Sequence, residues 1–176
     1  VVVYRDRSPE EIRDMSIVRL VNDTWTTPQP IYTDNWKIAG CPVNGPRMQA
    51  IGNNLAIAWY AMPTDKSEVK VIFSNDGGAT FSKPIQVDEG KAIGRVDLVM
   101  LEDKSVVVSW MEGSIIKAAR IDATGKKGES FTVASSSESR SSGFPQMTRS
   151  KTDVIFAWTN STAKNIDLVR IPLTSL

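Results

Sequence analysis

One pattern recurs about every 50 residues along this 176-residue chain, and it limits the fold more than any other feature of the sequence. Three copies begin with a polar residue followed by Met or Leu, and they run through apolar and small residues to a Trp: Arg47–Trp59, Asp97–Trp110 and Gln146–Trp158. The segment Val1–Tyr4 resembles the end of a fourth copy. Repeats of this length with several strands each are typical of the blades of a β-propeller.

The residues before each Trp alternate between large and small side chains. Leu55, Ile57 and Trp59 are bulky, whereas Ala56 and Ala58 between them are small. Successive side chains of a strand point to opposite faces of its sheet, so this strand has one bulky face and one slim face. We expect the bulky face of one blade to pack on the slim face of the next. No run of apolar residues at helical spacing competes with this interpretation.

The repeat predicts an all-β fold, a partial β-propeller of three to four blades that are each a four-stranded antiparallel sheet. A single domain, 1–176, divides into four approximate blades: 1–38, 39–90, 91–138 and 139–176. The first blade is expected to lack its innermost strand and the last its outermost, as in one part of a longer propeller. An incomplete ring of blades leaves strand edges unpaired, so we expect a second chain or self-association to complete the ring. In the alternative, the two partial blades combine and close a four-bladed ring.

Composition excludes several kinds of chemistry. The net charge of +1 gives no electrostatic reason to bind nucleic acid or an anionic membrane surface. No apolar run approaches the length of a membrane span. The chain has no His, which removes Ser-His-Asp and Cys-His catalysis and the usual zinc sites. Cys41 is the single cysteine, so no disulfide forms within the chain.

A polar turn lies between two segments rich in β-forming residues, Val69–Phe73 and Pro84–Val87. Ser74–Phe81 reads S-x-D-x-G-x-T-F, which matches the Asp-box, also called the bacterial neuraminidase repeat. In such a turn the carboxylate accepts backbone N–H groups, the glycines take positive φ and the aromatic residue plugs the blade. We expect structural roles, on the bottom of the blade, for these residues: Ser74, Asp76, Gly78, Thr80 and Phe81.

Further segments extend the resemblance to nearly the whole chain: Tyr4–Asp6, Cys41–Pro46, Gly94–Asp97 and Ser142–Pro145. With the Asp-box, they are similar to segments of bacterial proteins in the sialidase superfamily that are described as exo-α-sialidases. The resemblance implies a sialidase-like β-propeller. It also implies an extracytoplasmic location, because proteins of that group usually carry export signals.

Sialidases bind the carboxylate of sialic acid with three arginines, and the resemblance implies a similar set of arginines here. We expect them on the top face, the end of the blades at which the inner strands begin. Arg47 starts an inner strand, as do Asp97 and Gln146 at the same position of the next two repeats. Arg95 lies two residues before Asp97 and is therefore expected on the same side of the strand. The third arginine would come from Arg5, Arg13 or Arg140. Alternatively, each arginine forms a salt bridge with a neighbouring Asp at the rim.

The resemblance also implies a Tyr/Glu nucleophile pair and an Asp acid/base. Tyr60 with Glu112 is the candidate pair. The candidates for the acid/base are Asp6, Asp14 and Asp97. Trp36, in a connection between blades, either stacks on a sugar face or fills the gap between blades.

Two functions remain open. The first is an exo-α-sialidase-type glycoside hydrolase that acts on extracellular glycans, with this chain inactive by itself because part of a ring supplies only part of the site. The second is a non-catalytic propeller that binds glycans or proteins through its top face. The partners expected are sialylated or other anionic glycans. No cofactor is expected, although Asp88-Glu89-Gly90 and the Asp-box carboxylate could hold structural Ca²⁺.

Overall fold

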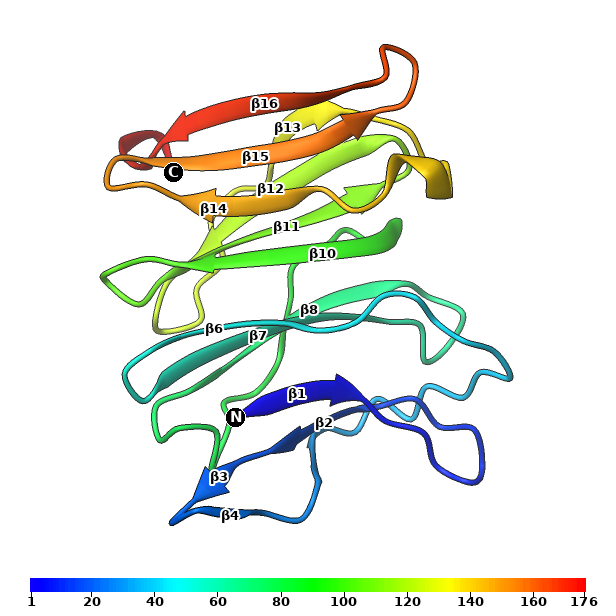
Figure 1. The fold of residues 1–176 in the computed structure, drawn as a ribbon, viewed down its shortest axis with the longest axis vertical. Coiled ribbons are helices and arrows are strands. Elements are labelled where there is room, and N and C mark those ends of the chain that lie inside the picture. Colours follow the sequence, from blue (N-terminus) through cyan, green and yellow to red (C-terminus); the bar gives the residue numbers. More distant parts are fainter.

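The computed structural model describes residues 1–176, and the chain is built almost entirely of antiparallel strands. Four sheets stack one upon another along the longest axis of the molecule, in chain order from blade 1 to blade 4 (Figure 1). The two helical segments are short 3₁₀ turns, η1 (Arg140–Ser142) and η2 (Leu173–Ser175). None of the helices has the length and apolarity that crossing a bilayer requires.

Blade 1 is a three-stranded sheet of β1 (Val2–Arg5), β2 (Met15–Val18) and β5 (Gln29–Tyr32), with a separate hairpin of β3 (Leu20–Val21) and β4 (Thr24–Trp25). Blade 2 is four-stranded: β6 (Arg47–Ile51), β7 (Asn54–Ala61), β8 (Glu68–Ser74) and β9 (Ile85–Gln86). Blade 3 is four-stranded: β10 (Ala92–Met100), β11 (Val106–Glu112), β12 (Ile115–Ile121) and β13 (Phe131–Ser135). Blade 4 is three-stranded: β14 (Gln146–Arg149), β15 (Asp153–Asn160) and β16 (Asn165–Pro172). The all-β prediction is confirmed.

The three repeated tryptophans occupy equivalent positions in successive blades. Trp59 lies on β7, Trp110 on β11 and Trp158 on β15, in each case the second strand of its sheet. Each pairs with a polar residue on the following strand: Trp59 with Lys70, Trp110 with Lys117 and Trp158 with Asp167. The repeat seen in the sequence therefore corresponds to a repeat in space.

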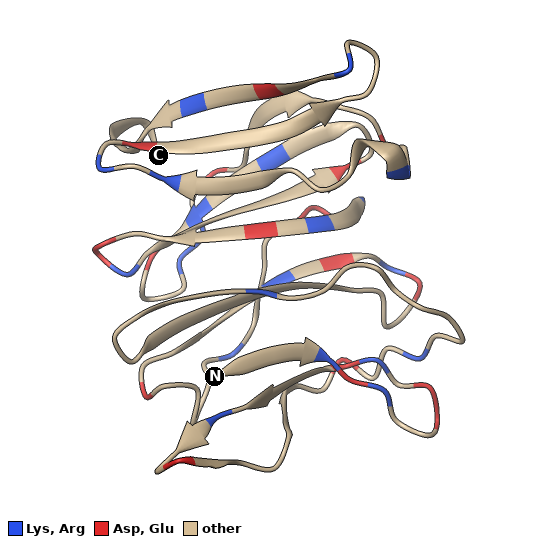
Figure 2. Cartoon of the chain, in the orientation of Figure 1, with Lys and Arg blue, Asp and Glu red and all other residues tan.

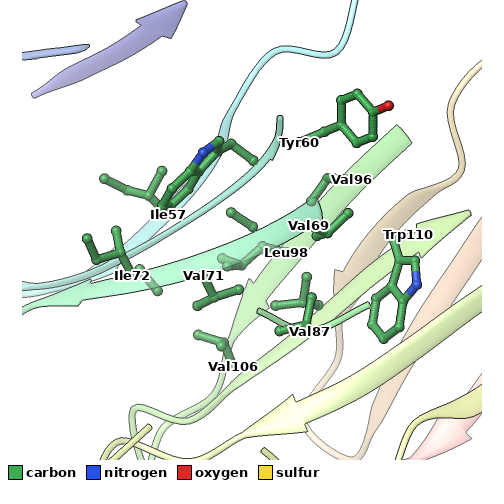
Figure 3. Close-up of a cluster of buried hydrophobic side chains, with 14 of the residues drawn as sticks. Ile57, Tyr60, Val69, Val71, Ile72, Val87, Val96, Leu98, Val106 and Trp110 are labelled. Atoms are coloured by element: carbon green, nitrogen blue, oxygen red, sulfur yellow. The ribbon is translucent and has the colours of Figure 1, made fainter. Parts of the chain in front are cut away.

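The core lies between blades and consists of two clusters. The larger one joins blades 1, 2 and 3, and it contains Trp59 and Trp110, which have no exposed surface. Figure 3 shows part of it, where Val71 of blade 2 lies near Leu98 of blade 3 and Val87 of blade 2 lies near Trp110 of blade 3. The smaller cluster joins the slim face of blade 3 to the bulky face of blade 4, which includes Phe156. The expected packing of a bulky face on a slim face is thus observed.

The predicted turn follows β8 and is held by its own side chains. The Ser74 hydroxyl donates to Asp76 Oδ1 at 2.8 Å and accepts from the Gly78 N–H at 2.9 Å. The Asp76 carboxylate also accepts from the Thr80 hydroxyl at 2.6 Å and from the N–H groups of Thr80 and Ala79, both at 2.9 Å. These bonds, that of the Thr80 hydroxyl foremost, hold the pKa of Asp76 well below its usual range. The turn is therefore most stable with Asp76 ionised.

The same turn rests on the neighbouring blade. Phe81 packs against the larger core cluster. Gly77 and Gly78 both have positive φ, +71° and +83°. A Cβ on Gly78 would lie 2.7 Å from Ile17 Cδ1 of blade 1, whereas a Cβ on Gly77 would meet no atom within 4 Å. Gly78 therefore permits a close contact between two blades as well as a turn.

This difference predicts unequal costs for two alanine substitutions. Gly77→Ala is expected to cost about 1 kcal/mol, because only the positive φ disfavours it. Gly78→Ala adds the overlap with the Ile17 side chain, and we expect it to lower the free energy of unfolding by about 2 to 3 kcal/mol. Urea denaturation followed by circular dichroism measures both variants. Equal losses in the free energy of unfolding would show that the close contact between Gly78 and Ile17 does not affect stability.

Candidate functional site

The inner strands β6, β10 and β14 begin side by side at one end of the sheets, which is the top face of the molecule and lies at the right of Figure 1. Basic and acidic residues are interspersed along this end (Figure 2). Arg47 Nη2 donates to Gln146 Oε1 at 3.3 Å, and Arg47 Nε lies 3.7 Å from Asp97 Oδ1. The three residues that occupy one repeat position are therefore brought together. The Arg47 side chain is 41% exposed and retains N–H groups that a ligand could reach.

Two adjoining hollows open beside these residues. The larger has a volume of about 470 Å³ and includes Arg140 in its wall, and the smaller, of about 300 Å³, includes Arg47. Val43 and Phe144 line both hollows. Arg140 is exposed, and its guanidinium makes no hydrogen bond or ion pair within the chain. The arrangement places two guanidinium groups beside a shared apolar wall.

The loop before β6 is fastened to β10 at an irregular point of that strand. Asn44 Oδ1 accepts from the Arg95 N–H at 2.8 Å, and Asn44 Nδ2 donates to the Ile93 carbonyl at 3.3 Å. Gly94 has a φ of +89°, and a Cβ there would lie 2.5 Å from Asn44 Cγ. Only glycine allows the Asn44 side chain to approach the backbone this closely. The contact fixes one wall of the larger hollow.

Arg95 does not belong to a clamp with Arg47, contrary to the prediction. Its buried guanidinium donates to three carbonyls of the segment before η1: Ser137 at 3.0 Å, Glu138 at 2.6 Å and Ser139 at 2.9 Å. Burial lowers the pKa of Arg95, and nearby Glu138 partly offsets this effect. Since backbone carbonyls take up these donors, Arg95 holds the loop that carries Arg140.

Arg5 has a comparable structural role. Its guanidinium donates to the carbonyls of Arg13 at 2.6 Å, Tyr60 at 2.7 Å and Asn44 at 2.8 Å. Burial lowers the pKa of Arg5 to about 10. The guanidinium also lies over the ring of Trp36, 4.8 Å from its centroid. Arg5 therefore joins blade 1 to blade 2 and does not face a ligand.

Trp36 fills the gap between blades, which was one of the two roles considered for it. Its side chain is buried, and its ring packs edge-on against Tyr60 with the ring centroids 5.7 Å apart. No face of this ring is open to a sugar. The prediction that Trp36 binds substrate is wrong because the ring is part of the core.

The predicted residues of the β1–β2 connection contact other residues of blade 1. Arg13 forms an ion pair at 2.6 Å, as in the alternative considered for the arginines, but its partner is Glu11 and not an Asp. The Asp14 carboxylate accepts from the N–H of Trp36 at 3.2 Å, and burial raises the pKa of Asp14. Asp6 accepts from the Ser16 hydroxyl at 3.1 Å. Neither hollow has any of these residues in its wall.

Tyr60 and Glu112 do not form a nucleophile pair. The Tyr60 hydroxyl donates to Met62 Sδ at 3.8 Å, and burial raises the pKa of Tyr60. Glu112 accepts from Trp110 Nε1 at 2.9 Å and pairs with Lys117 at 3.1 Å. Burial alone would raise the pKa of Glu112, but the bonds from Trp110 and Lys117 outweigh it and lower the pKa. Each side chain is committed to a neighbour within its own blade, so the predicted pair is wrong.

Asp97 is the candidate acid that lies beside Arg47, a residue in the wall of the smaller hollow, although Asp97 itself lines neither hollow. Its buried carboxylate accepts from the N–H of Met147 at 2.5 Å and from that of Leu98 at 2.9 Å. Burial raises the pKa of Asp97, although these two bonds and the charge of Arg47 oppose the rise. Asp97 therefore binds a proton at a higher pH than an exposed aspartate does. It also connects blade 3 to the first strand of blade 4.

Sequence reasoning missed three residues that shape the hollows: Val43, Asn44 and Phe144. All three lie in segments that carry the resemblance, but no charge marked them as candidates. The Asn-Gly-Pro run that contains Asn44 was the available signal, because Asn and Gly favour tight turns.

No cluster of three or more His, Cys, Asp or Glu side chains is arranged to hold a metal ion. Both carboxylate oxygens of Asp88, one of the residues considered for Ca²⁺, accept backbone N–H groups, from Val69 at 2.6 Å and from Gly90 at 2.7 Å. Structural Ca²⁺ stays a prediction.

No protein-family model and no curated protein matches this sequence. Among solved structures, the chain is similar to the crystal structure of a mutant of the GH43 protein BlXynB from Bacillus licheniformis, with a TM-score of 0.51 and 10% sequence identity. The match covers 95% of this chain and 39% of that protein, so the chain spans about two fifths of its length. The likeness, with the stack of four sheets, confirms the predicted fold class, an all-β partial β-propeller. Membership of the sialidase superfamily and the Asp-box assignment stay predictions.

Proposed function

We propose that the hollows on the top face bind an anionic saccharide, and that the chain is the glycan-recognising part of a sialidase-like propeller acting on extracellular glycans. The observation that carries this proposal is the pair of guanidinium groups beside the apolar wall of Val43 and Phe144. Arg140 has no partner within the chain, and Arg47 contacts Gln146 and Asp97 but is 41% exposed. Guanidinium groups recognise a carboxylate through charge-assisted hydrogen bonds, and an aromatic wall accepts the apolar face of a sugar ring.

Two further points support the proposal. The resemblance to the sialidase superfamily implies a carboxylated sugar as the ligand, bound by arginines. The similar GH43 protein belongs, as its name states, to a glycoside hydrolase family. Ligand sites that combine an apolar wall with a few polar groups are the usual form for small molecules.

We expect the 176-residue protein to bind N-acetylneuraminic acid in calorimetric titration. Arg47→Ala and Arg140→Ala should each weaken binding about tenfold, because each removes one charge-assisted contact with the carboxylate. Arg149→Ala is the matched control. Arg149 lies at the other end of β14, paired with Glu102 at 2.6 Å, and its replacement should leave affinity unchanged. Equal affinity in all four proteins, or no heat at millimolar sugar, would contradict the proposal.

The second candidate function is hydrolysis of a sialoside, with Asp97 as the acid. The raised pKa of Asp97 favours it, because a general acid must hold its proton near the working pH. The missing Tyr60–Glu112 pair argues against turnover by this chain alone. The same titration separates the two functions when it is repeated with a fluorogenic sialoside. Binding without release of the fluorophore indicates a binding module, and release that Asp97→Asn abolishes indicates an enzyme.

A further inference from the structure

A third hollow lies at the opposite end of the sheets from Arg47 and Arg140. We call it the bottom hollow, because it opens where the inner strands β6 and β10 end, at the left of Figure 1. Its volume of about 350 Å³ is within the range of roughly 300 to 1,000 Å³ that is usual for small-molecule sites. Both inner blades contribute to its wall, blade 2 with Leu55 and blade 3 with Met100. The hollow is therefore a product of the packing of blade 2 on blade 3.

The wall of the bottom hollow combines aromatic surface with uncharged polar groups. Phe73 and Phe81 both line it and are only partly buried. Asn75 is exposed, and its side-chain amide makes no hydrogen bond within the chain, so the amide can both donate and accept. The other uncharged polar residues of the wall are Asn54, Ser74, Thr80 and Ser82. Such a wall suits a sugar ring, whose apolar face packs on aromatic rings and whose hydroxyl groups pair with amides and hydroxyls.

Charge distinguishes the bottom hollow from the two on the top face. Lys104 is the one charged residue in its wall, and the Lys104 ammonium forms no ion pair. The turns that frame the hollow contain the carboxylates of Asp76 and Asp122, which are bonded to the hydroxyl groups of threonines and not to a cation. These carboxylates offset the charge of Lys104, so the surroundings do not select an anion. The Lys104 ammonium can still donate hydrogen bonds to an uncharged hydroxyl group.

The turns that form the wall are each held by an aspartate. Asp76 holds the turn that follows β8, as described above. In the β10–β11 turn, Asp103 accepts from the Ser105 hydroxyl at 2.6 Å and from the Ser105 N–H at 3.0 Å. In the β12–β13 turn, Asp122 accepts from the Thr124 hydroxyl at 2.6 Å and from the Lys126 N–H at 3.0 Å. The bottom hollow is therefore fully formed before a ligand enters.

We propose that the bottom hollow is a second saccharide site, which binds an uncharged pyranose unit. The sugar ring lies against Phe73 and Phe81, and its hydroxyl groups pair with the Asn75 amide and the Lys104 ammonium. This site uses none of the residues of the top face and takes a ligand of different charge. Because the two sites lie at opposite ends of the sheets, occupation of one leaves the other open.

Titration of the ¹⁵N-labelled 176-residue protein with four uncharged sugars, followed by nuclear magnetic resonance, tests the proposal. The sugars are the methyl glycosides of glucose, galactose, mannose and xylose. At least one is expected to bind with a Kd of about 1 to 10 mM and to shift the backbone amide signals of Asn75, Phe81 and Ala123. N-acetylneuraminic acid should leave these signals unchanged. No shift with any of the four sugars at about 50 mM, or shifts confined to the top-face residues Arg140 and Phe144, would overturn the proposal.

Two pairs of variants locate the sugar in the bottom hollow. Asn75→Ala removes the free amide and should raise the Kd at least about threefold, whereas Asn53→Ala, in an exposed turn outside the wall, should not change it. Ala123→Leu enlarges an exposed side chain of the wall and should raise the Kd at least about fivefold, whereas Ala79→Leu, exposed but outside the wall, should not. Circular dichroism shows whether each variant retains its sheets. Equal affinity in all four variants would overturn the proposal.

The top-face variant Arg140→Ala separates the two proposed sites. It should bind the uncharged sugar as tightly as the unmodified protein does, because Arg140 lies at the other end of the sheets. A protein that binds no N-acetylneuraminic acid but still binds the uncharged sugar would contradict the proposed function alone. Loss of the uncharged sugar in Arg140→Ala would show that this sugar occupies the top face, and it would overturn the second site.

Discussion

Replacing Trp110 with alanine is expected to lower the free energy of unfolding by about 3 to 5 kcal/mol. The Trp110 side chain has no exposed surface and lies in the cluster that joins blades 1, 2 and 3. Its indole Nε1 also donates to Glu112 Oε1 at 2.9 Å. The substitution removes the largest side chain between two blades and leaves a cavity that strands paired on both sides cannot close.

The control for this prediction is a second tryptophan in an exposed position. Trp25 of β4 is 54% exposed, so Trp25→Ala is expected to change stability by no more than about 0.5 kcal/mol. Urea denaturation followed by far-ultraviolet circular dichroism measures both variants without relying on tryptophan fluorescence. A Trp110→Ala protein as stable as Trp25→Ala would contradict the packing of blade 3 on blade 2.

The second large effect is expected for Arg95→Met, which should cost at least about 2 kcal/mol of stability. The substitution keeps most of the side-chain volume and removes the donors that three carbonyls of residues 137–139 share. Those carbonyls then lack partners in a partly buried loop. The expected outcome distinguishes a structural arginine from a ligand-binding one, because a ligand-binding arginine can be removed with little loss of stability.

Arg140→Met is the matched experiment. Arg140 is exposed and without a partner in the chain, so its replacement should change stability by no more than about 0.5 kcal/mol and should still weaken binding of the sugar. Denaturation and titration of both variants measure the two properties separately. If Arg95→Met were fully stable but unable to bind, Arg95 would belong to the clamp after all.

The fold could be predicted from the sequence because its signal repeats. The second strand of three successive blades carries a Trp at the same position: Trp59, Trp110 and Trp158. The alternation of large and small residues before each Trp indicates which face of the blade is bulky and which is slim. The meeting of Arg47, Asp97 and Gln146 follows from the same repetition, since equivalent residues on adjacent inner strands lie side by side.

The failure at Arg95 has a definite physical cause. The prediction used the two-residue period of a strand, but β10 is irregular between Gly94 and Asp97. Gly94 and Arg95 both have positive φ, +89° and +55°, and the register with β11 shifts there. A bulge of this kind redirects side chains, so Arg95 and Asp97 no longer share a side. The prediction from the sequence did not include this irregularity in β10.

Tyr60 and Glu112 failed for a different reason. Both lie near the top ends of their strands, as expected, and their position alone suggested a pair. Their actual partners, Met62 for Tyr60 and Lys117 for Glu112, are set by the packing of each blade. Position along a repeat can be read from a sequence, whereas the choice among several nearby partners depends on distances that only the folded chain defines.

The guanidinium groups of the half-buried Arg5 and the buried Arg95 hold loops that line the larger hollow, and this has a thermodynamic consequence. Arg5 ties residue 44 to the strands beneath it, and Arg95 ties residues 137–139, so the walls on either side are already rigid in the free protein. A sugar that enters finds a preorganised surface and loses little affinity to the ordering of loops. Its heat of binding should therefore report contacts with the ligand itself, with almost no contribution from refolding of the rim.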